Sequence, residues 1–169
     1  MFEMNVPYDK GQMKIKLEDK NLAGVLEGRQ SDYKTTLSEN EIVEQSLNNP
    51  IGSKSLEELA KGKKNIVIIS SDHTRPVPSK IITPILLRRI RSVSPDARIR
   101  ILVATGFHRE STHEELVAKY GEDIVKNEEI VMHVSTDDSS MLKIGQLPSG
   151  GDCIINKVAA EADLLISEG

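Results

Sequence analysis

A short segment of this sequence carries four side chains that could bind or react with a small molecule. Residues 70–79 read SSDHTRPVPS and overlap the end of an apolar run, NIVIIS, that is typical of a buried strand. Within four positions the segment supplies a carboxylate, an imidazole, a hydroxyl and a guanidinium, on Asp72, His73, Thr74 and Arg75. Pro76 and Pro78 then restrict the backbone that presents these groups. A connecting loop needs only turn residues, so this segment is a candidate site.

Asp72 and Arg75 each allow more than one interpretation. Asp72 could serve a site, or it could cap the following helix or form a structural ion pair with Arg75. Arg75 lies beside two prolines and could hold a carboxylate or a phosphate with both arms of its guanidinium. The alternative for Arg75 is an ordinary surface arginine. We favour a binding role for Arg75 because nothing near it in the sequence calls for solvation.

A second candidate, His108, follows the residues ATG at the end of another apolar run. Gly106 would allow the backbone to turn tightly out of a strand. Because imidazole titrates near neutral pH, His108 could act as a general acid or base. It could equally be a loop histidine whose ring is satisfied by a backbone carbonyl, and the residues alone leave both interpretations open.

The other histidines and the short motifs favour no conventional catalytic or metal site. We expect His73 to orient its loop, His113 to face solvent and His133 to pack within a strand. The sequence has no His-x-x-x-His or Cys-x-x-Cys spacing, so we expect no metal ligands in this chain. Gly-x-Gly-x-x-Gly, the Walker phosphate loop and Gly-x-Ser-x-Gly are also missing, which argues against a Rossmann NAD site, a Walker site and a serine-hydrolase site.

Alternating helices and strands are expected to position the candidate residues. Capping-box spacings predict three helix starts, at Ser38 with Glu41, at Ser55 with Glu58 and at Thr112 with Glu115. Apolar periodicity predicts a helix over 79–93, and Asn156 would cap a helix over 157–162. The expected strands span 13–18, 65–70, 98–106, 129–134 and 163–169, with a hairpin within 142–155. This alternation predicts an α/β fold, a three-layer sandwich with a mainly parallel, Rossmann-like sheet.

Polar residues follow each strand of the expected parallel sheet. Asp72 and its neighbours follow the strand over 65–70, and Thr105, Gly106, His108 and Arg109 lie at or after the end of the strand over 98–106. Ser135, Thr136, Asp137 and Asp138 follow the strand over 129–134, and Ser167 and Glu168 lie at the end of the strand over 163–169. Ligands of open parallel sheets bind outside the carboxyl ends of the strands. We therefore expect these side chains to meet at one edge of the sheet.

The composition narrows the class of protein further. The chain has 169 residues, with 22 basic against 26 acidic side chains and a net charge of −4. This length suits a single domain, and the acidic balance and few aromatic residues argue against nucleic-acid binding. A single cysteine, Cys153, favours a reducing, cytoplasmic setting. No stretch resembles a signal peptide or a membrane span.

Three segments resemble the N-terminal domain of the lactate racemase family. They read SSDHTRPVPSKIITPILLRRI, ILVATGFHRESTHEEL and INKVAAEADLLISEG, and the similarity runs from about Asn65 to residue 169. The resemblance implies a 2-hydroxy-acid racemase or epimerase that transfers a hydride to and from a nickel-pincer nucleotide. It implies that His108 is one acid/base, that Arg75 holds the substrate carboxylate and that Asp72 contacts the cofactor or orients Arg75. Cofactor-binding roles are implied for Asp72, Thr74, Arg75, Thr105 and Gly106.

The resemblance also implies that part of the active site lies outside these residues. The family's second histidine, the lysine joined to the cofactor and the nickel-ligating histidine would all follow residue 169. We therefore expect residues 1–169 to be one N-terminal cofactor- and substrate-cleft domain of a longer two-domain enzyme, inactive alone. The expected partners are the C-terminal domain and cofactor maturation enzymes. Two alternatives remain, a small hydrolase or lyase that uses Asp72 and His108, and a noncatalytic domain that binds a carboxylate or phosphate ligand.

Overall fold

A computed structural model describes residues 1–169, apart from the side chain of Ser31. The chain divides into two compact units, Met1–Thr36 and Leu37–Gly169. The first unit is an antiparallel pair, β1 (Phe2–Tyr8) and β2 (Gly11–Leu17), followed by two 3-10 turns, η1 (Asp19–Asn21) and η2 (Arg29–Asp32). β2 corresponds to the strand predicted over 13–18, whereas β1 was not predicted. The expectation that residues 1–169 act as one cleft domain stays a prediction.

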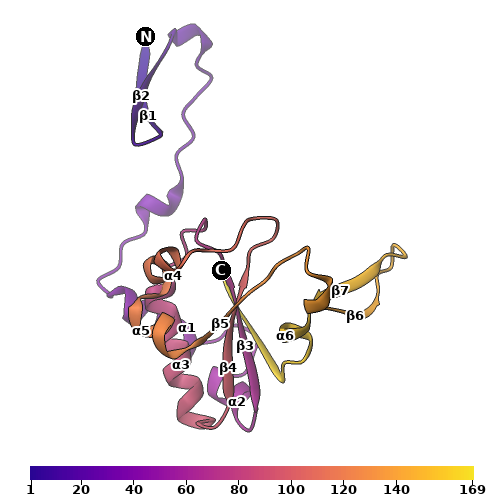
Figure 1. Cartoon of the computed structure of the whole chain (residues 1–169). Helices are drawn as coiled ribbons and strands as arrows, with labels where there is room; N and C mark the ends of the chain where they lie inside the picture. Colours follow the sequence, from indigo (N-terminus) through magenta and orange to yellow (C-terminus); the bar gives the residue numbers. More distant parts are fainter. The chain divides into compact units, whose positions relative to one another are not determined.

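A four-stranded parallel sheet forms the centre of the second unit, in the order β5-β4-β3-β8 (Figure 1). Its strands are β3 (Asn65–Ser71), β4 (Arg98–Ala104), β5 (Glu129–Met132) and β8 (Leu164–Glu168). The helices are α1 (Glu39–Asn48), α2 (Leu56–Ala60), α3 (Ser79–Val93), α4 (His113–Tyr120), α5 (Glu122–Asn127) and α6 (Lys157–Ala160). A hairpin of β6 (Met141–Gln146) and β7 (Asp152–Asn156) and the 3-10 turn η3 (Asp138–Ser140) complete the unit. The predicted α/β class with a mainly parallel sheet is confirmed.

Local sequence signals place most of the helix ends. All three predicted capping boxes are present, at the starts of α1, α2 and α4, and the Asn156 side chain caps α6. The helix predicted over 79–93 matches α3 at both ends. The structure adds α5, a short helix that was not predicted and that begins directly after Gly121. Gly121, with a positive φ of 91°, ends α4 as its C-cap and is at the same time the N-cap of α5.

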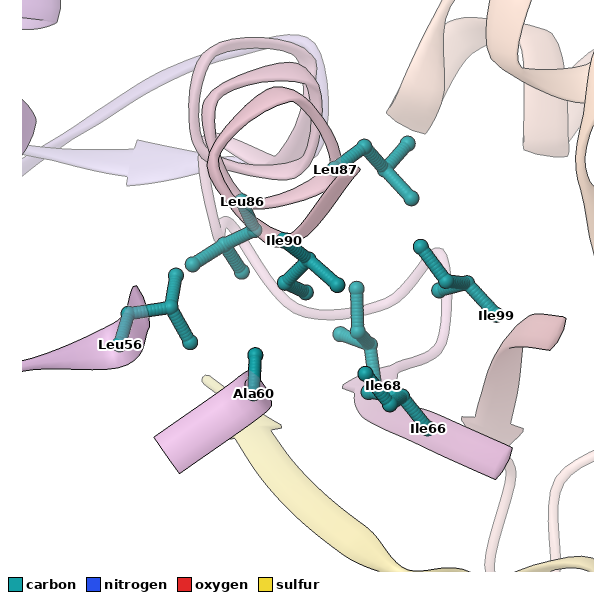
Figure 2. Packing of buried hydrophobic residues seen from close by; sticks show 8 residues of the cluster. All are labelled: Leu56, Ala60, Ile66, Ile68, Leu86, Leu87, Ile90 and Ile99. Carbon is teal, nitrogen blue, oxygen red and sulfur yellow. The ribbon is translucent and has the colours of Figure 1, made fainter. Parts of the chain in front are cut away.

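The main core lies between one face of the sheet and α2 and α3. Ile66 and Ile68 of β3 pack with Ile99 of β4 beneath α3 (Figure 2). The helices contribute the other labelled side chains, Leu56, Ala60, Leu86, Leu87 and Ile90. Alternate residues of a strand face one side of a sheet, so this packing also fixes which residues of β3 and β4 face the other side.

The opposite face of the sheet has a thinner cover. Val67 and Leu102 pack there against Ala159 of α6, and Figure 1 shows α6 and the β6–β7 hairpin on this side. Leu165 of β8 and Ile154 of β7 are 46% and 55% exposed. The expected three layers are thus present, but the third consists of one four-residue helix and a hairpin.

Candidate functional site

The candidate site lies at the carboxyl edge of the parallel sheet. β3 pairs in parallel with β4 on one side and with β8 on the other, so the loops that follow these strands emerge together. Ser71, the last residue of β3, lies opposite Ala104, the last residue of β4. Asp72 and Thr105 therefore begin neighbouring loops, as the predicted convergence of strand ends requires.

Asp72 organises the loop between β3 and α3. Its carboxylate oxygen Oδ1 accepts hydrogen bonds from the Thr74 backbone N–H at 3.0 Å and from the Thr74 hydroxyl at 2.6 Å. This is an aspartate-stabilised turn, and it orders the backbone ahead of Pro76 and Pro78. Pro78, not Asp72, occupies the N-cap of α3. The capping interpretation of Asp72 is therefore wrong.

The second oxygen of Asp72 binds His108, which lies 36 residues further along the chain. Asp72 Oδ2 and His108 Nδ1 are 2.5 Å apart. The Asp72 side chain is 3% exposed, whereas the His108 side chain is 48% exposed. His108 is thus satisfied by a buried carboxylate and not by a backbone carbonyl, and no ion pair joins Asp72 to Arg75 among the described side chains.

The charge state of Asp72 fixes the proton positions on His108. Burial alone would raise the pKa of Asp72, but the hydrogen bonds from Thr74 and His108 outweigh it and lower this pKa to about 2. At neutral pH Asp72 is therefore ionised and can only accept hydrogen bonds. His108 Nδ1 must then carry the proton that it donates to Asp72, which leaves Nε2 of a neutral ring as the proton acceptor.

Arg75 stands beside this pair without a partner of its own. Among the described residues its guanidinium makes no hydrogen bond or ion pair, although its backbone N–H donates to the Asp72 carbonyl at 3.3 Å. A hollow of about 230 Å³ is lined by Ser71, Asp72, Arg75, Ala104, Thr105, Gly106, Phe107 and His108. Four other residues predicted to act in catalysis or cofactor binding line this hollow together with Asp72, namely Arg75, Thr105, Gly106 and His108. The fifth, Thr74, is held beside it in the turn that Asp72 forms.

Thr105 and Gly106 shape the wall of the hollow. The Thr105 side chain is buried, and its hydroxyl donates to the His133 carbonyl. That hydroxyl is therefore engaged within the protein. Gly106 has a φ of +60°, in the left-handed region that side chains rarely adopt. This turn directs His108 back toward Asp72, and the predicted tight turn at Gly106 is present.

The other histidines lie outside the central hollow. His73 Nδ1 is 2.9 Å from the Ser111 hydroxyl and its Nε2 is 3.4 Å from Glu115, which ties the loop after β3 to the start of α4. His113 is exposed in the first turn of α4. His133 is half-buried and follows β5 directly, with Nδ1 3.4 Å from the Asn156 amide. His73 orients its loop and His113 faces solvent as expected, whereas His133 lies just after β5 and not within a strand.

Glu168 was expected at this sheet edge, but the buried polar layer that it joins beneath the site was not predicted from the sequence. The Tyr120 hydroxyl donates to the Ser70 hydroxyl at 2.9 Å, and burial raises the pKa of Tyr120 to about 12. Glu168 is buried at the end of β8, with both carboxylate oxygens 3.5 Å from the Thr83 hydroxyl. Tyr120 lies four residues after Leu116, and this i, i+4 spacing on the inner face of α4 was the available signal.

Ionisation of Asp72 should make the folded chain sensitive to acid. The pKa of Asp72 is about 2 in the folded chain, below its ordinary value of 3.8, so its ionised carboxylate stabilises the fold. This contribution to the free energy of unfolding is complete above about pH 4 and is lost as the pH falls toward 2. We expect the free energy of unfolding lost on Asp72→Asn to be about 2 kcal/mol at pH 7 and roughly half that at pH 3. Urea unfolding of the chain at several pH values measures this difference.

The matched control for this measurement is Asp96→Asn, which removes an exposed carboxylate between α3 and β4. Asp96→Asn should change the free energy of unfolding by less than about 0.5 kcal/mol throughout. A cost of Asp72→Asn that stays constant between pH 7 and pH 3 would contradict the lowered pKa.

No group of three or more histidine, cysteine, aspartate or glutamate side chains among the described residues is arranged to hold a metal ion. Within the same residues, no helix has both the length and the apolar character needed to cross a membrane.

The second unit is an α/β domain with a parallel sheet. At the carboxyl edge of this sheet, a buried aspartate pairs with an exposed histidine beside an arginine. The family described as the lactate racemase N-terminal domain matches residues 8–169, and the chain belongs to this family. The lactate racemases of Lactiplantibacillus plantarum and Thermoanaerobacterium thermosaccharolyticum are 76% and 52% identical to the chain over all 169 residues. The chain spans 40% of the length of each of these relatives.

Solved structures agree with this assignment. The lactate racemase apoprotein from Thermoanaerobacterium thermosaccharolyticum matches with a TM-score of 0.86 and 49% identity, over 98% of this chain and 38% of that one. A crystal structure of a protein from Thermotoga maritima matches with a TM-score of 0.57 and 20% identity, over 78% of this chain and 33% of that one. The second similarity concerns the fold alone.

Proposed function

We propose that this chain forms the N-terminal, site-bearing part of a racemase that interconverts the enantiomers of lactate or a related 2-hydroxy acid. The observation that carries the proposal is the pairing of buried Asp72 with exposed His108 in a hollow that also contains Arg75. Its relatives are named lactate racemases and are longer than this chain, which spans 40% of each. The proposed enzyme therefore needs a further part of the polypeptide to complete its site.

His108 acts in the proposed reaction as a general acid and base. Its Nε2 takes the proton of the substrate hydroxyl as the C–H bond at the same carbon breaks, and returns it when that bond re-forms. Asp72 holds the proton on Nδ1 and stabilises the imidazolium that forms in between. Because Asp72 is itself fixed by Thr74, the ring of His108 is oriented before substrate binds.

Arg75 binds the carboxylate that every 2-hydroxy acid carries. A guanidinium can form two parallel hydrogen bonds to a carboxylate, and that of Arg75 has no competing partner among the described residues. With the carboxylate at Arg75 and the hydroxyl at His108, the reacting carbon is held between two fixed groups. This arrangement selects a hydroxyl and a carboxylate on adjacent carbons.

The residues of the hollow fit the nickel-pincer nucleotide that the family resemblance implies. Phe107 at the rim is 94% exposed and offers a flat apolar surface to a ring, and Arg75 offers a cation to an anionic group. Arg75, Thr74 and the backbone at Gly106 would hold the cofactor within this chain. When bound, such a nucleotide supplies the acceptor that takes a hydride from the substrate carbon and returns it to either face. We place this chemistry in the cytoplasm, which suits the single Cys153.

A chimaera tests the proposed function directly. This chain would replace the matching N-terminal part of the Lactiplantibacillus plantarum lactate racemase, and the product would be made with nickel and the cofactor maturation enzymes. We expect the chimaera to convert L-lactate to D-lactate and the reverse, and the 169-residue chain alone to show no conversion. Chiral chromatography of the lactate measures both directions.

The parent racemase, made and loaded in the same way, is the control for the chimaera. If the chimaera folds and binds the cofactor as the parent does yet converts no lactate, the assignment to lactate is wrong. If that chimaera racemises another 2-hydroxy acid instead, the proposed reaction stands and only the proposed substrate is replaced.

A further inference from the structure

The hairpin of β1 and β2 has one polar face and one apolar face. Residues that pair across an antiparallel ladder place their side chains on the same face, and alternate residues of a strand face opposite sides. On the polar face, the Nζ atoms of Lys14 and Lys16 lie 3.3 Å and 2.9 Å from the carboxylate of Glu3. The side chains of the opposite face are all apolar or aromatic, namely Phe2, Met4, Val6 and Tyr8 of β1 and Met13, Ile15 and Leu17 of β2.

This apolar face is largely open to solvent. Met4 and Ile15 pair at its centre and are 42% and 36% exposed. Tyr8, Met13 and Leu17 are exposed as well. Folded proteins seldom leave a contiguous apolar patch of this kind uncovered, and such a patch marks a surface that contacts another molecule or another part of the protein.

A hairpin of this size needs a partner in order to be stable. β1 and β2 have seven residues each, and an isolated pair of strands is only marginally stable in water. Asp9 at the turn has a φ of 49°, in the left-handed region that a residue with a side chain adopts at a cost in free energy. Burial of the apolar face would offset these costs, because each buried aliphatic side chain stabilises the packed state.

The relatives of this chain contain enough additional polypeptide to cover the hairpin. The two lactate racemases align with all 169 residues, which make up only 40% of each, so more than half of each relative lies outside the matching part. A segment of the same polypeptide meets the hairpin at an effective concentration on the order of millimolar, whereas a second copy is present only at its bulk concentration. The tethered segment is therefore the stronger competitor for the face.

We propose that the apolar face of the β1–β2 hairpin is a docking surface for the part of the longer polypeptide that lies outside residues 1–169. The partner surface must itself be apolar, because this face offers no charged group and its one polar side-chain atom is the Tyr8 hydroxyl at the turn. The ion pairs of Glu3 then remain on the solvent side of the docked hairpin. This inference rests on the proposed function only in that both take the chain to be part of a longer protein, and it does not require racemase activity.

Hydrogen exchange of the 169-residue chain and of the chimaera tests the docking surface. Both proteins contain the same hairpin, but only the chimaera contains the rest of the polypeptide. We expect the paired backbone amides of residues 2–17 to exchange about 10²-fold more slowly in the chimaera, because docking suppresses local opening of the hairpin. The proposal is overturned if these amides exchange equally fast in the two proteins.

Ile15→Thr removes apolar surface from the centre of the face but keeps a β-branched side chain, which suits a strand. In the chimaera it should speed exchange of residues 2–17 about tenfold or more and lower the melting temperature by about 2–5 °C. In the 169-residue chain, where the face is already open, it should change the melting temperature by less than about 1 °C.

Asn5→Thr is the matched control, because Asn5 pairs with Lys14 and therefore lies on the polar face. It should neither speed exchange nor lower the melting temperature of the chimaera. Equal effects of Ile15→Thr and Asn5→Thr in the chimaera would show that the apolar face is not buried there, and the inference would be wrong.

Two other occupants of the face would give different results. If a second copy covers it, the 169-residue chain will sediment as a dimer at micromolar concentration, with its hairpin amides protected in the dimer. If another part of the 169 residues covers it, these amides will be protected in the monomeric chain as strongly as in the chimaera. Either result overturns the proposal. Racemase activity does not enter these measurements, so an inactive chimaera with a protected hairpin counts against the proposed function alone.

Discussion

Asp72→Asn should strongly reduce racemisation by the chimaera. We expect kcat to fall by as much as about 10⁴-fold, with little change in the affinity for lactate. The asparagine amide can donate a hydrogen bond to Nδ1, which would move the ring proton to Nε2. His108 would then present a proton where the substrate hydroxyl needs an acceptor.

Steady-state kinetics in both directions measure this effect, together with cofactor content. Asp138→Asn is the matched control, because it removes an exposed carboxylate that follows β5 in the same sheet. It should keep kcat within about threefold. If Asp72→Asn binds the cofactor and retains more than a tenth of the parental kcat, the orientation of His108 does not depend on Asp72.

His108→Ala is expected to lower kcat by about 10² to 10⁴-fold, the usual contribution of a positioned general acid or base. The hollow is open and His108 is 48% exposed, so added imidazole can reach the vacated position. Imidazole should therefore restore part of the activity of His108→Ala in a concentration-dependent way. A purely structural histidine would show no such rescue.

His113→Asn is the control for the histidine substitution, since His113 is exposed in the first turn of α4. It should leave kcat unchanged within error. The double variant of Asp72→Asn with His108→Ala should be no slower than His108→Ala alone, because Asp72 acts through His108. Fully additive losses would show that Asp72 has a separate role in the reaction.

Local signals in the sequence determined the secondary structure around the site. The capping boxes at Ser38, Ser55 and Thr112 and the apolar periodicity of 79–93 each involve residues within a few positions of one another. Such short-range preferences act before the chain is folded and can be identified without tertiary information. The alternation of these helices with apolar strands was enough to predict the parallel sheet and the edge where polar loops converge.

Long-range packing decided what the sequence left open. β1 pairs with β2, and α5 starts directly after Gly121, the residue that ends α4. The sequence left Asp72 with three possible roles. Its contact with His108 depends on the register of β3 and β4, which sets Ser71 beside Ala104. The buried, unpartnered Ser79 is likewise a product of tertiary packing.

In this protein the sequence sets the chemistry of the side chains, and the tertiary structure sets their contacts. Residue types and their spacing determined which groups could react, since Asp72, Arg75 and His108 keep their chemistry in any fold. Only the tertiary structure decided which of them touch, because a hydrogen bond between residues 36 positions apart depends on the whole sheet that brings their loops together. The hydrogen bonds that keep Asp72 ionised and the burial that leaves Ser79 without a partner are likewise properties of the folded chain alone.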